Sequence, residues 1–479
     1  MSPPLHRRVA WTAALAYRAP LEARFAFRPA ALVERAQRRR VGAVVAHAYE
    51  HVPYYRETMR RLELAPGDIA AAGDLAKLPL IEREQLQRDP EYFVSRAEPR
   101  GELLELRSGG STGEPISVFR HPFALFQGAA YRERIRSPIM RLARKRVRFR
   151  EALIALPDKG ARQEFGHRTL IPSSVRVVRA RFSMLSPLQE VVDGLNEFRP
   201  DVIATYGSYL EALFGHLLES GAACALPRVA VYSSDALSDQ ARTLITEHFG
   251  IEVLSVYRAI EASQIGFECE RHEGHHLNVD LCPVRIVDPG GVEVDDGEPG
   301  EVVTSNIYAR GTILLNYRLG DLAAKLPRTC SCGRSLPLLS SVRGRTDEWL
   351  AGPDGEPIHG QAIRNMMRGH HEVLRYQFVQ ERVRSFRAAV IVKPGTDRDA
   401  LVGSLESGLR ERFGAGVELR ASFPAELPRT AGGKTKPVVS LVTGQGAPTR
   451  NASRCAGSRA SWSRRASAPT SPRSSAWPT

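Results

Sequence analysis

An alternation of short β-prone runs with helical stretches, between Glu102 and about Arg345, constrains the fold of this chain more than any other feature. Runs such as DVIATYG, RVAVYSSD and IEVLSVY have the length and β-branched content of strands, whereas SDQARTLITEHF has helical spacing. Strands that alternate with helices along a chain form a sheet that the helices cover. The sequence therefore predicts an α/β body.

The segments on either side of this body have different patterns. Before it, helical spacing continues to about Arg40, and a second amphipathic stretch is interrupted near Pro53. After it, strand-like RYQFVQ and FRAAVIVKPG precede a helical segment with one apolar stripe. The residues of that stripe are Leu401, Leu405, Leu409 and Phe413.

Three parts are expected from these patterns. The last of them consists of Ser, Ala, Arg, Pro and Thr and has too little apolar content to build a core, so we expect it to be disordered. The expected parts are a large N-terminal α/β domain over residues 1–345, a small mobile α+β lid domain over residues 346–442, and a basic tail over residues 443–479.

Composition and charge narrow the classes of function. No run of about 18 apolar residues occurs and no convincing signal-peptide cleavage site follows the N-terminal stretch, so we expect a cytoplasmic protein without a membrane partner. The net charge is +14, and the six arginines of the tail contribute part of it. A second basic segment, Arg132 to Arg150, is typical either of a surface that attracts an anionic cofactor or acidic carrier protein, or of a solvated arginine-rich face. Aromatic residues interleave poorly with these charges, which disfavours nucleic-acid stacking.

A loop rich in glycine and hydroxyl residues, LRSGGSTGEPISVF, lies between two β-prone runs at Leu106 to Phe119. Such a loop exposes backbone N–H groups and hydroxyls without bulky side chains, as binding to a phosphate chain requires. It is not a Walker A loop, because it lacks the Gly-Lys-Ser/Thr ending and leads into the strand-like PISVF. By itself it fits a tight hairpin as well as it fits a phosphate loop.

Four further motifs follow this loop in order: SVYRAIEAS, LLNYRLGDLA, VRGRTDEWL and LPRTAGGKTKP. Together with HVPYYRE near the N-terminus, the series resembles the adenylate-forming superfamily. Within it, the chain is similar to the branch of phenylacetate-coenzyme A ligases and their capsule-biosynthesis and coenzyme F390 synthetase relatives. The resemblance extends from about Val41 to Val442.

The resemblance implies a role for each matching residue. Glu261 corresponds to the acidic residue that engages Mg²⁺ and the phosphates, and Lys434 to the lysine of the small domain that reaches the adenylating centre. Asp321 corresponds to the carboxylate that holds the ribose hydroxyls of ATP, assisted by Arg345. The remaining matches are Tyr257 beside the adenine, Asp347 at the hinge between the domains, and Ser108, Gly109, Gly110, Ser111, Thr112 and Gly113 in the loop over the phosphates.

These residue types suit the chemistry of carboxylate activation. A carboxylate attacks ATP poorly, so an enzyme must align it with the α-phosphorus and neutralise the charge that accumulates on the phosphate oxygens. Two departures from the family pattern stand out. Glu114 replaces a common lysine, so one phosphate contact is absent or supplied by an arginine elsewhere, and Arg258 and Ala259 replace small residues, which leaves the local nucleotide or acyl pocket unassigned.

A cluster of cysteines points to a metal. In a cytoplasmic protein disulfides are not expected, so clustered thiols favour metal-binding or reactive roles. TCSCGR and FECERHEGHHLNVD together offer a Cys₃His set for a closed, structural zinc site, with buried free thiols as the alternative. Zinc-binding relatives of the phenylacetate branch show a similar arrangement, in which HLNVD aligns His276 with their ligand. The candidate ligands are Cys269, His276, Cys330 and Cys332.

We therefore expect an acid–thiol ligase that uses ATP, Mg²⁺ and coenzyme A, with a structural Zn²⁺. Resemblance to the phenylacetate branch suggests an aryl or arylalkyl acid as substrate. An acyl carrier protein or an amine is the alternative acceptor, and a homodimer is left open. A zinc-containing nucleic-acid-binding protein is the alternative from another class.

Overall fold

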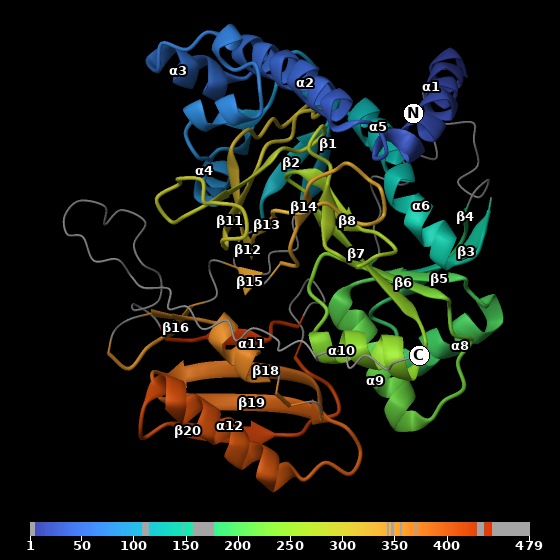
Figure 1. Ribbon diagram of the computed structural model, residues 1–479, viewed down its shortest axis with the longest axis vertical. Helices are drawn as coiled ribbons and strands as arrows, with labels where there is room; N and C mark the ends of the chain where they lie inside the picture. Colours follow the sequence, from blue (N-terminus) through green and yellow to red (C-terminus); the bar gives the residue numbers. More distant parts are fainter. Residues whose placement is uncertain are drawn as a thin grey trace, which may run out of the picture.

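The protein folds into an α/β body and a smaller α+β unit that lies beneath it (Figure 1). No helix in the described part of the chain is both long enough and apolar enough to cross a membrane. The computed structural model describes residues 5–107, 115–146, 148–156, 177–342, 344–345, 349–354, 357–367, 369–370, 372–428 and 435–442.

A nine-stranded mixed sheet forms the centre of the body, in the order β13-β14-β9-β8-β7-β6-β5-β3-β4. Neighbouring strands from β4 to β7 are parallel, and those from β7 to β13 are antiparallel. The bounds are β3 (Phe149–Ala155), β4 (Val177–Ser183), β5 (Val202–Thr205), β6 (Val229–Ser233), β7 (Glu252–Ala259), β8 (Ser263–Glu268), β9 (His275–Leu277), β13 (Lys325–Leu326) and β14 (Leu338–Leu339).

Helices cover both faces of the parallel part, because its strands are apolar on both sides. Ile203 packs with α8 and α9, whereas its neighbour Val202 packs with α1, α2 and α6 on the opposite face. The α/β fold class expected from the sequence is confirmed. The helices are α1 (Leu5–Phe25), α2 (Ala30–His51), α3 (Pro53–Arg61), α5 (Pro122–Tyr131), α6 (Glu133–Leu142), α8 (Leu188–Phe198), α9 (Gly207–Ser220), α10 (Asp239–Thr243) and the π-helical turn η5 (Leu244–His248).

A second sheet and a hairpin complete the body, and they pack with α2, α3 and the short helices near them. The sheet has the order β10-β11-β12-β15, and β1 pairs with β2 in the hairpin. The bounds are β1 (Leu104–Arg107), β2 (Ser117–Arg120), β10 (Val284–Val287), β11 (Gly300–Thr304), β12 (Tyr317–Ala323), β15 (Gly344–Arg345), α4 (Arg83–Arg88), η1 (Pro66–Asp68), η2 (Gly73–Lys77), η3 (Pro90–Phe93) and η4 (Arg100–Glu102).

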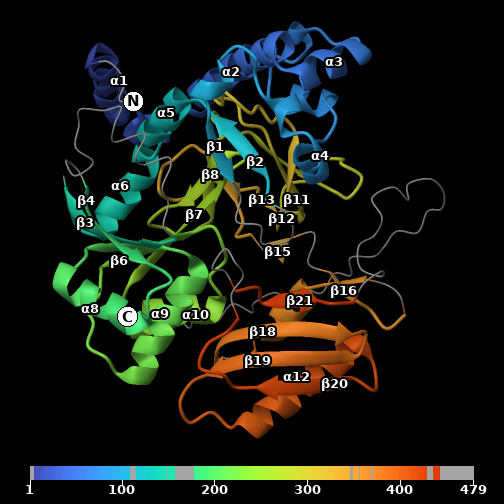
Figure 2. The same cartoon turned by 180° about the vertical axis from the view of Figure 1, so that it is seen from behind.

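The smaller unit is a four-stranded sheet, in the order β20-β19-β18-β21, with α12 packed on it and a hairpin, β16-β17, beside it (Figure 2). The predicted stripe Leu401, Leu405, Leu409 and Phe413 is buried against this sheet. Residues 346–348 lie outside the described ranges, so the domain boundary after residue 345 stays a prediction. The bounds are β16 (Trp349–Ala351), β17 (Pro357–His359), α11 (Gln361–Met367), β18 (Val373–Arg382), β19 (Ser385–Val392), α12 (Arg398–Phe413), β20 (Glu418–Ser422) and β21 (Val438–Ser440).

The basic segment that begins at Arg132 is not a uniform solvated face. Arg134, on α6, is fully buried and forms ion pairs with Glu22 of α1 at 2.6 Å and Asp280 at 2.7 Å. These pairs compensate the buried guanidinium charge and hold α1 on the body. This part of the segment therefore serves the fold rather than an anionic partner.

Candidate adenylating site

Tyr257, Asp321 and Arg345 meet where the two sheets of the body approach each other. Asp321 on β12 lies opposite Arg345 on β15 in the strand register. The Tyr257 hydroxyl donates to Asp321 Oδ2 at 2.7 Å, and Arg345 Nη1 donates to Asp321 Oδ1 at 3.1 Å. The structure thus brings together three residues that lie far apart in the sequence.

The electrostatics of this trio keep the tyrosine protonated. Burial, and then the Asp321 charge, raise the pKa of Tyr257 well above its usual value, so its hydroxyl remains a donor. A carboxylate offers about four acceptor sites, so the side chain of Asp321 suits hydroxyl groups as donors. The arrangement can therefore bind a vicinal diol such as a ribose.

Glu261 lies in the turn between β7 and β8, four residues after Tyr257. Burial is the largest cause that raises the pKa of its carboxyl, while Arg83 and Arg345 act in the opposite direction. A bound divalent cation would stabilise the charged carboxylate that burial disfavours. The role of Glu261 as a ligand of Mg²⁺ stays a prediction.

Some of the predicted site residues lie outside the described residues. Their flanks are described: β1 and β2 bracket the loop, and Thr435 follows the predicted lysine. The Thr435 hydroxyl accepts a hydrogen bond from Arg375 Nη2 at 3.1 Å. The predicted residues outside the described ranges are Ser108, Gly109, Gly110, Ser111, Thr112, Gly113, Asp347 and Lys434.

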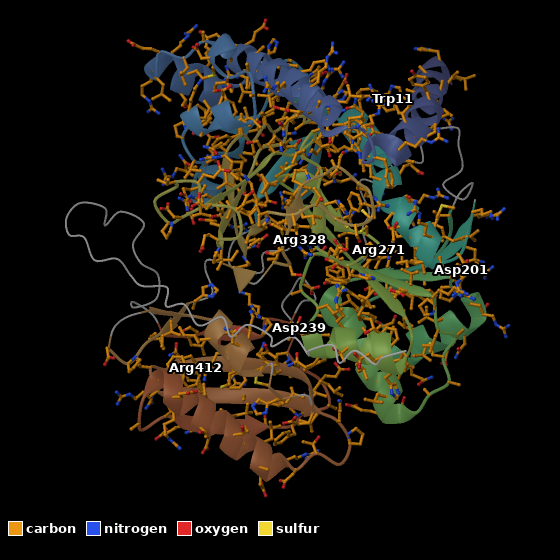
Figure 3. All side chains as sticks on the ribbon, in the orientation of Figure 1. Trp11, Asp201, Asp239, Arg271, Arg328 and Arg412 are labelled. Atoms are coloured by element: carbon orange, nitrogen blue, oxygen red, sulfur yellow. The ribbon has the colours of Figure 1, made fainter. Side chains whose placement is uncertain are left out.

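The smaller unit contacts the body through polar groups near Arg375, the residue that bonds Thr435. Arg375 Nε lies 3.8 Å from a carboxylate oxygen of Glu211 on α9. The Gln240 side chain donates to the Met367 carbonyl at 2.7 Å. Gln240 follows Asp239, the first residue of α10, which is labelled in Figure 3. Burial raises the pKa of Glu211, and the Arg375 charge opposes that change. These contacts hold the smaller unit in one position relative to the body.

The four predicted metal ligands converge at the edge of the large sheet, between the loops marked by Arg271 and Arg328 in Figure 3. Their four ligand atoms all lie within 4.8 Å of one another. Cys269 Sγ lies 3.6 Å from Cys330 Sγ, and Cys332 Sγ lies 3.3 Å from His276 Nε2. Tetrahedral zinc with Zn–S bonds of about 2.3 Å separates its ligand atoms by about 3.5–3.8 Å. The cluster therefore has the composition and spacing of a closed zinc site.

The surroundings of the cluster also suit a metal. Burial lowers the pKa of His276 to about 4, so its imidazole is neutral and can ligate at pH 7. The backbone N–H groups of Arg271 and Arg334 donate to the sulfurs of Cys269 and Cys332 at 3.4 and 3.5 Å. Such N–H···S bonds, from donors outside the set of metal ligands, orient the thiolates.

Sequence reasoning missed two features of the site. Arg120 is buried against the main chain of Glu261, and Glu211 meets Arg375 across the two units. Neither belongs to a motif quoted from the sequence for its chemistry. The one available signal was the position of Arg120 at the end of the strand that follows the glycine-rich loop.

Comparison with known proteins agrees with this geometry. The family model for the CapK C-terminal domain matches residues 350–440. Phenylacetate-coenzyme A ligase of Thermus thermophilus is 24% identical over 85% of this chain and 96% of its own length. Protein CapK of Staphylococcus aureus is 21% identical over 81% of this chain and 85% of its own length.

The fold is also that of a solved ligase. 2-Hydroxyisobutyryl-CoA ligase in the postadenylation state has a TM-score of 0.69 and 17% identity over 86% of this chain and 90% of its own. In its thioesterification state the TM-score falls to 0.58.

Fold and site together define an adenylate-forming protein. Within that superfamily, the named relatives and the C-terminal domain match support the branch of phenylacetate-coenzyme A ligases and CapK.

Proposed function

We propose that the protein is an ATP-dependent carboxylic acid ligase that forms an acyl-adenylate and then an acyl thioester with coenzyme A. One observation carries the proposal: Asp321, held by Tyr257 and Arg345, lies with Glu261 where the two sheets meet. The match to phenylacetate-coenzyme A ligases over most of the chain supports it.

In the first half-reaction a carboxylate oxygen of the acid attacks the α-phosphorus of ATP, and pyrophosphate leaves. Asp321 accepts hydrogen bonds from the ribose and fixes the nucleotide, while the N–H groups of the loop at 108–113 bind the phosphates. Mg²⁺ held by Glu261 would neutralise charge on the phosphate oxygens when bound. Lys434 supplies a further positive charge at the adenylating centre.

In the second half-reaction a deprotonated thiol attacks the acyl carbon, and AMP leaves. Hinge movement at Asp347 would carry Lys434 away and present another face of the small domain to the thiol. Coenzyme A is the proposed acceptor, since the relatives are named as coenzyme A ligases. The phenylacetate-coenzyme A ligase relatives do not favour an amine acceptor or a nucleic-acid-binding role.

The substrate that we propose is an aryl or arylalkyl acid, as the names of the relatives suggest. We also propose that Cys269, His276, Cys330 and Cys332 hold a structural Zn²⁺, on the strength of their spacing and burial. That ion would join the β8–β9 and β13–β14 loops and would take no part in the chemistry.

Pyrophosphate release by the purified full chain tests the proposed function. A panel of aromatic, arylalkyl and short aliphatic acids would be assayed with ATP and MgCl₂, in the presence of coenzyme A, hydroxylamine or a holo-carrier protein. We expect acid-dependent pyrophosphate release, and a stable thioester only with coenzyme A. If the protein binds ATP but no acid of the panel causes pyrophosphate release, the result contradicts the proposal.

A further inference from the structure

A buried arginine connects the strand that follows the phosphate loop to the segment that carries Glu261. Arg120 is the last residue of β2 and is only 2% exposed. Its Nη2 group donates to the Ile260 carbonyl at 2.7 Å and to the Glu261 carbonyl at 3.0 Å. Both views place β2 beside β8, which begins just after Glu261 (Figures 1 and 2).

The arginine is unusual because no charged group among the described residues pairs with it. No carboxylate lies within ion-pair distance of Arg120 among the described residues, and its Nη1 group has no hydrogen-bond partner there. Burial lowers the pKa of this guanidinium, whereas Tyr308 and Glu261 favour its charged form. A buried cation that bonds only to main-chain carbonyls costs stability. A side chain with a purely structural role would be replaced at little cost by an apolar one.

The strand that carries Arg120 is itself fixed. The Phe119 carbonyl accepts from the Thr312 N–H at 2.7 Å, and the Phe119 N–H donates to the Thr312 hydroxyl at 2.8 Å. Gly311 makes this contact possible: its φ is +102°, and a Cβ there would lie 2.4 Å from the Phe119 carbonyl oxygen. The main chain next to Arg120 is therefore held firmly in place.

The target of the guanidinium has a second donor. Asn306, 1% exposed, also points its amide toward the Glu261 carbonyl, at 3.4 Å. The turn is closed by the β7–β8 pairing of Ala259 with Ser263, whose φ of +68° an L-residue seldom adopts. Donors from β2 and from Asn306 thus add a support for the Glu261 main chain from outside this turn.

We propose that Arg120 is a positioning residue, which supports the Glu261 main chain and through it the position of the Glu261 carboxylate. The inference rests on the proposed function. It predicts that Arg120 acts through Glu261 and hence through the Mg²⁺ dependence of adenylation, and that the affinity for the acid does not depend on it.

The test compares the Mg²⁺ dependence of pyrophosphate release in Arg120→Met, Arg120→Lys and wild type, with the best acid of the panel. Arg120→Met keeps the volume but loses the donors, and we expect its half-saturating MgCl₂ concentration to rise about 10-fold to 100-fold, as loss of charge-assisted hydrogen bonds implies. Arg120→Lys should recover part of this change. The KM for the acid and the melting temperature should change little.

Arg412→Met is the control, because Arg412 Nη1 also donates to a main-chain carbonyl, that of Gly408, at 2.7 Å. It should leave the Mg²⁺ dependence unchanged. In a Glu261→Gln background, Arg120→Met should add no further change, because residues that act as one unit are not additive.

Three results would overturn the inference: a wild-type Mg²⁺ dependence in Arg120→Met, additive effects in the Glu261→Gln background, or a loss of activity that follows unfolding alone. If Arg120→Met does not fold, Arg120→Lys decides by the same criteria. Absence of acid-dependent activity in the wild type would overturn the proposed function as well, and that failure is visible without any variant.

Discussion

Replacing Asp321 by alanine tests the nucleotide site most directly. The substitution removes the acceptor of two observed hydrogen bonds, from Tyr257 and Arg345, and the proposed acceptor of the ribose hydroxyls. The loop at 108–113, Glu261 and Lys434 remain. Binding of ATP should therefore weaken, while the chemistry on bound ATP proceeds.

The magnitude follows from the environment of the carboxylate. The Asp321 side chain is only 16% exposed, so hydrogen bonds to it are partly shielded from water. A hydrogen bond to a charged group contributes about 1.5–3 kcal/mol, which corresponds to an increase of about 10-fold to 150-fold in the apparent KM for ATP. Arg345 is 31% exposed, so loss of its ion pair should cost less than about 1 kcal/mol of folding stability.

Steady-state pyrophosphate release at varied ATP measures this effect. We expect kcat and the KM for the acid to stay within a few-fold of the wild type, since the lost interaction is made equally in the ground and transition states. Asp321→Asn should show a smaller rise, and Asp193→Ala, at an exposed position on α8, should show none. A folded Asp321→Ala variant with the wild-type KM for ATP would refute the assignment of the NYRLGD motif.

Three further predictions concern the metal cluster and the smaller unit. Replacing Cys330 and Cys332 by serine should release about one zinc ion per chain and lower the melting temperature, because structural zinc adds to folding free energy; metal analysis that finds stable, zinc-free wild type would contradict this. Lys434→Ala should slow adenylation about 100-fold to 1000-fold and spare thiol transfer from a supplied acyl-adenylate, whereas equal damage to both half-reactions would show that the lysine is structural. Glu211→Gln should weaken the contact with Arg375 and slow adenylation about 5-fold without slowing thiol transfer. Quenched-flow measurements report both steps, and equal slowing of the two would exclude the idea that this contact serves adenylation alone.

The sequence predicts the elements of the fold where local patterning determines them. Strand runs such as IEVLSVY reappear as β7, and Pro53 begins a new helix, α3, where the helical pattern is interrupted. The stripe from Leu401 to Phe413 is buried because helical spacing alone places these side chains on one face. The order of the nine strands could not be predicted in this way, because it depends on contacts between residues distant in the chain.

The same distinction between local patterns and contacts distant in the chain applies to the candidate site. Residues within motifs, such as Tyr257 and Asp321, could be selected in advance, although the hydrogen bond between them could not. Arg120 could not be selected, because the one signal, its position at the end of the strand after the glycine-rich loop, does not distinguish a buried arginine from the many exposed ones. Arg134 shows the same difficulty in the opposite direction: it lies in a run of basic residues that suggests a surface, yet its charge is neutralised inside the protein.

Arg345 has a consequence for how nucleotide and domain movement communicate. Its side chain donates to Asp321, while its main-chain carbonyl accepts from His359 of β17, in the hairpin beyond residues 346–348, at 2.6 Å. One residue would thus take part in both of the proposed equilibria, occupancy of the ribose site and orientation of the smaller unit. Thermodynamic linkage then requires reciprocity: if bound nucleotide favours one orientation by some factor, that orientation must bind nucleotide more tightly by the same factor. Release of AMP after thioester formation and the return of the smaller unit would therefore depend on the same coupling free energy.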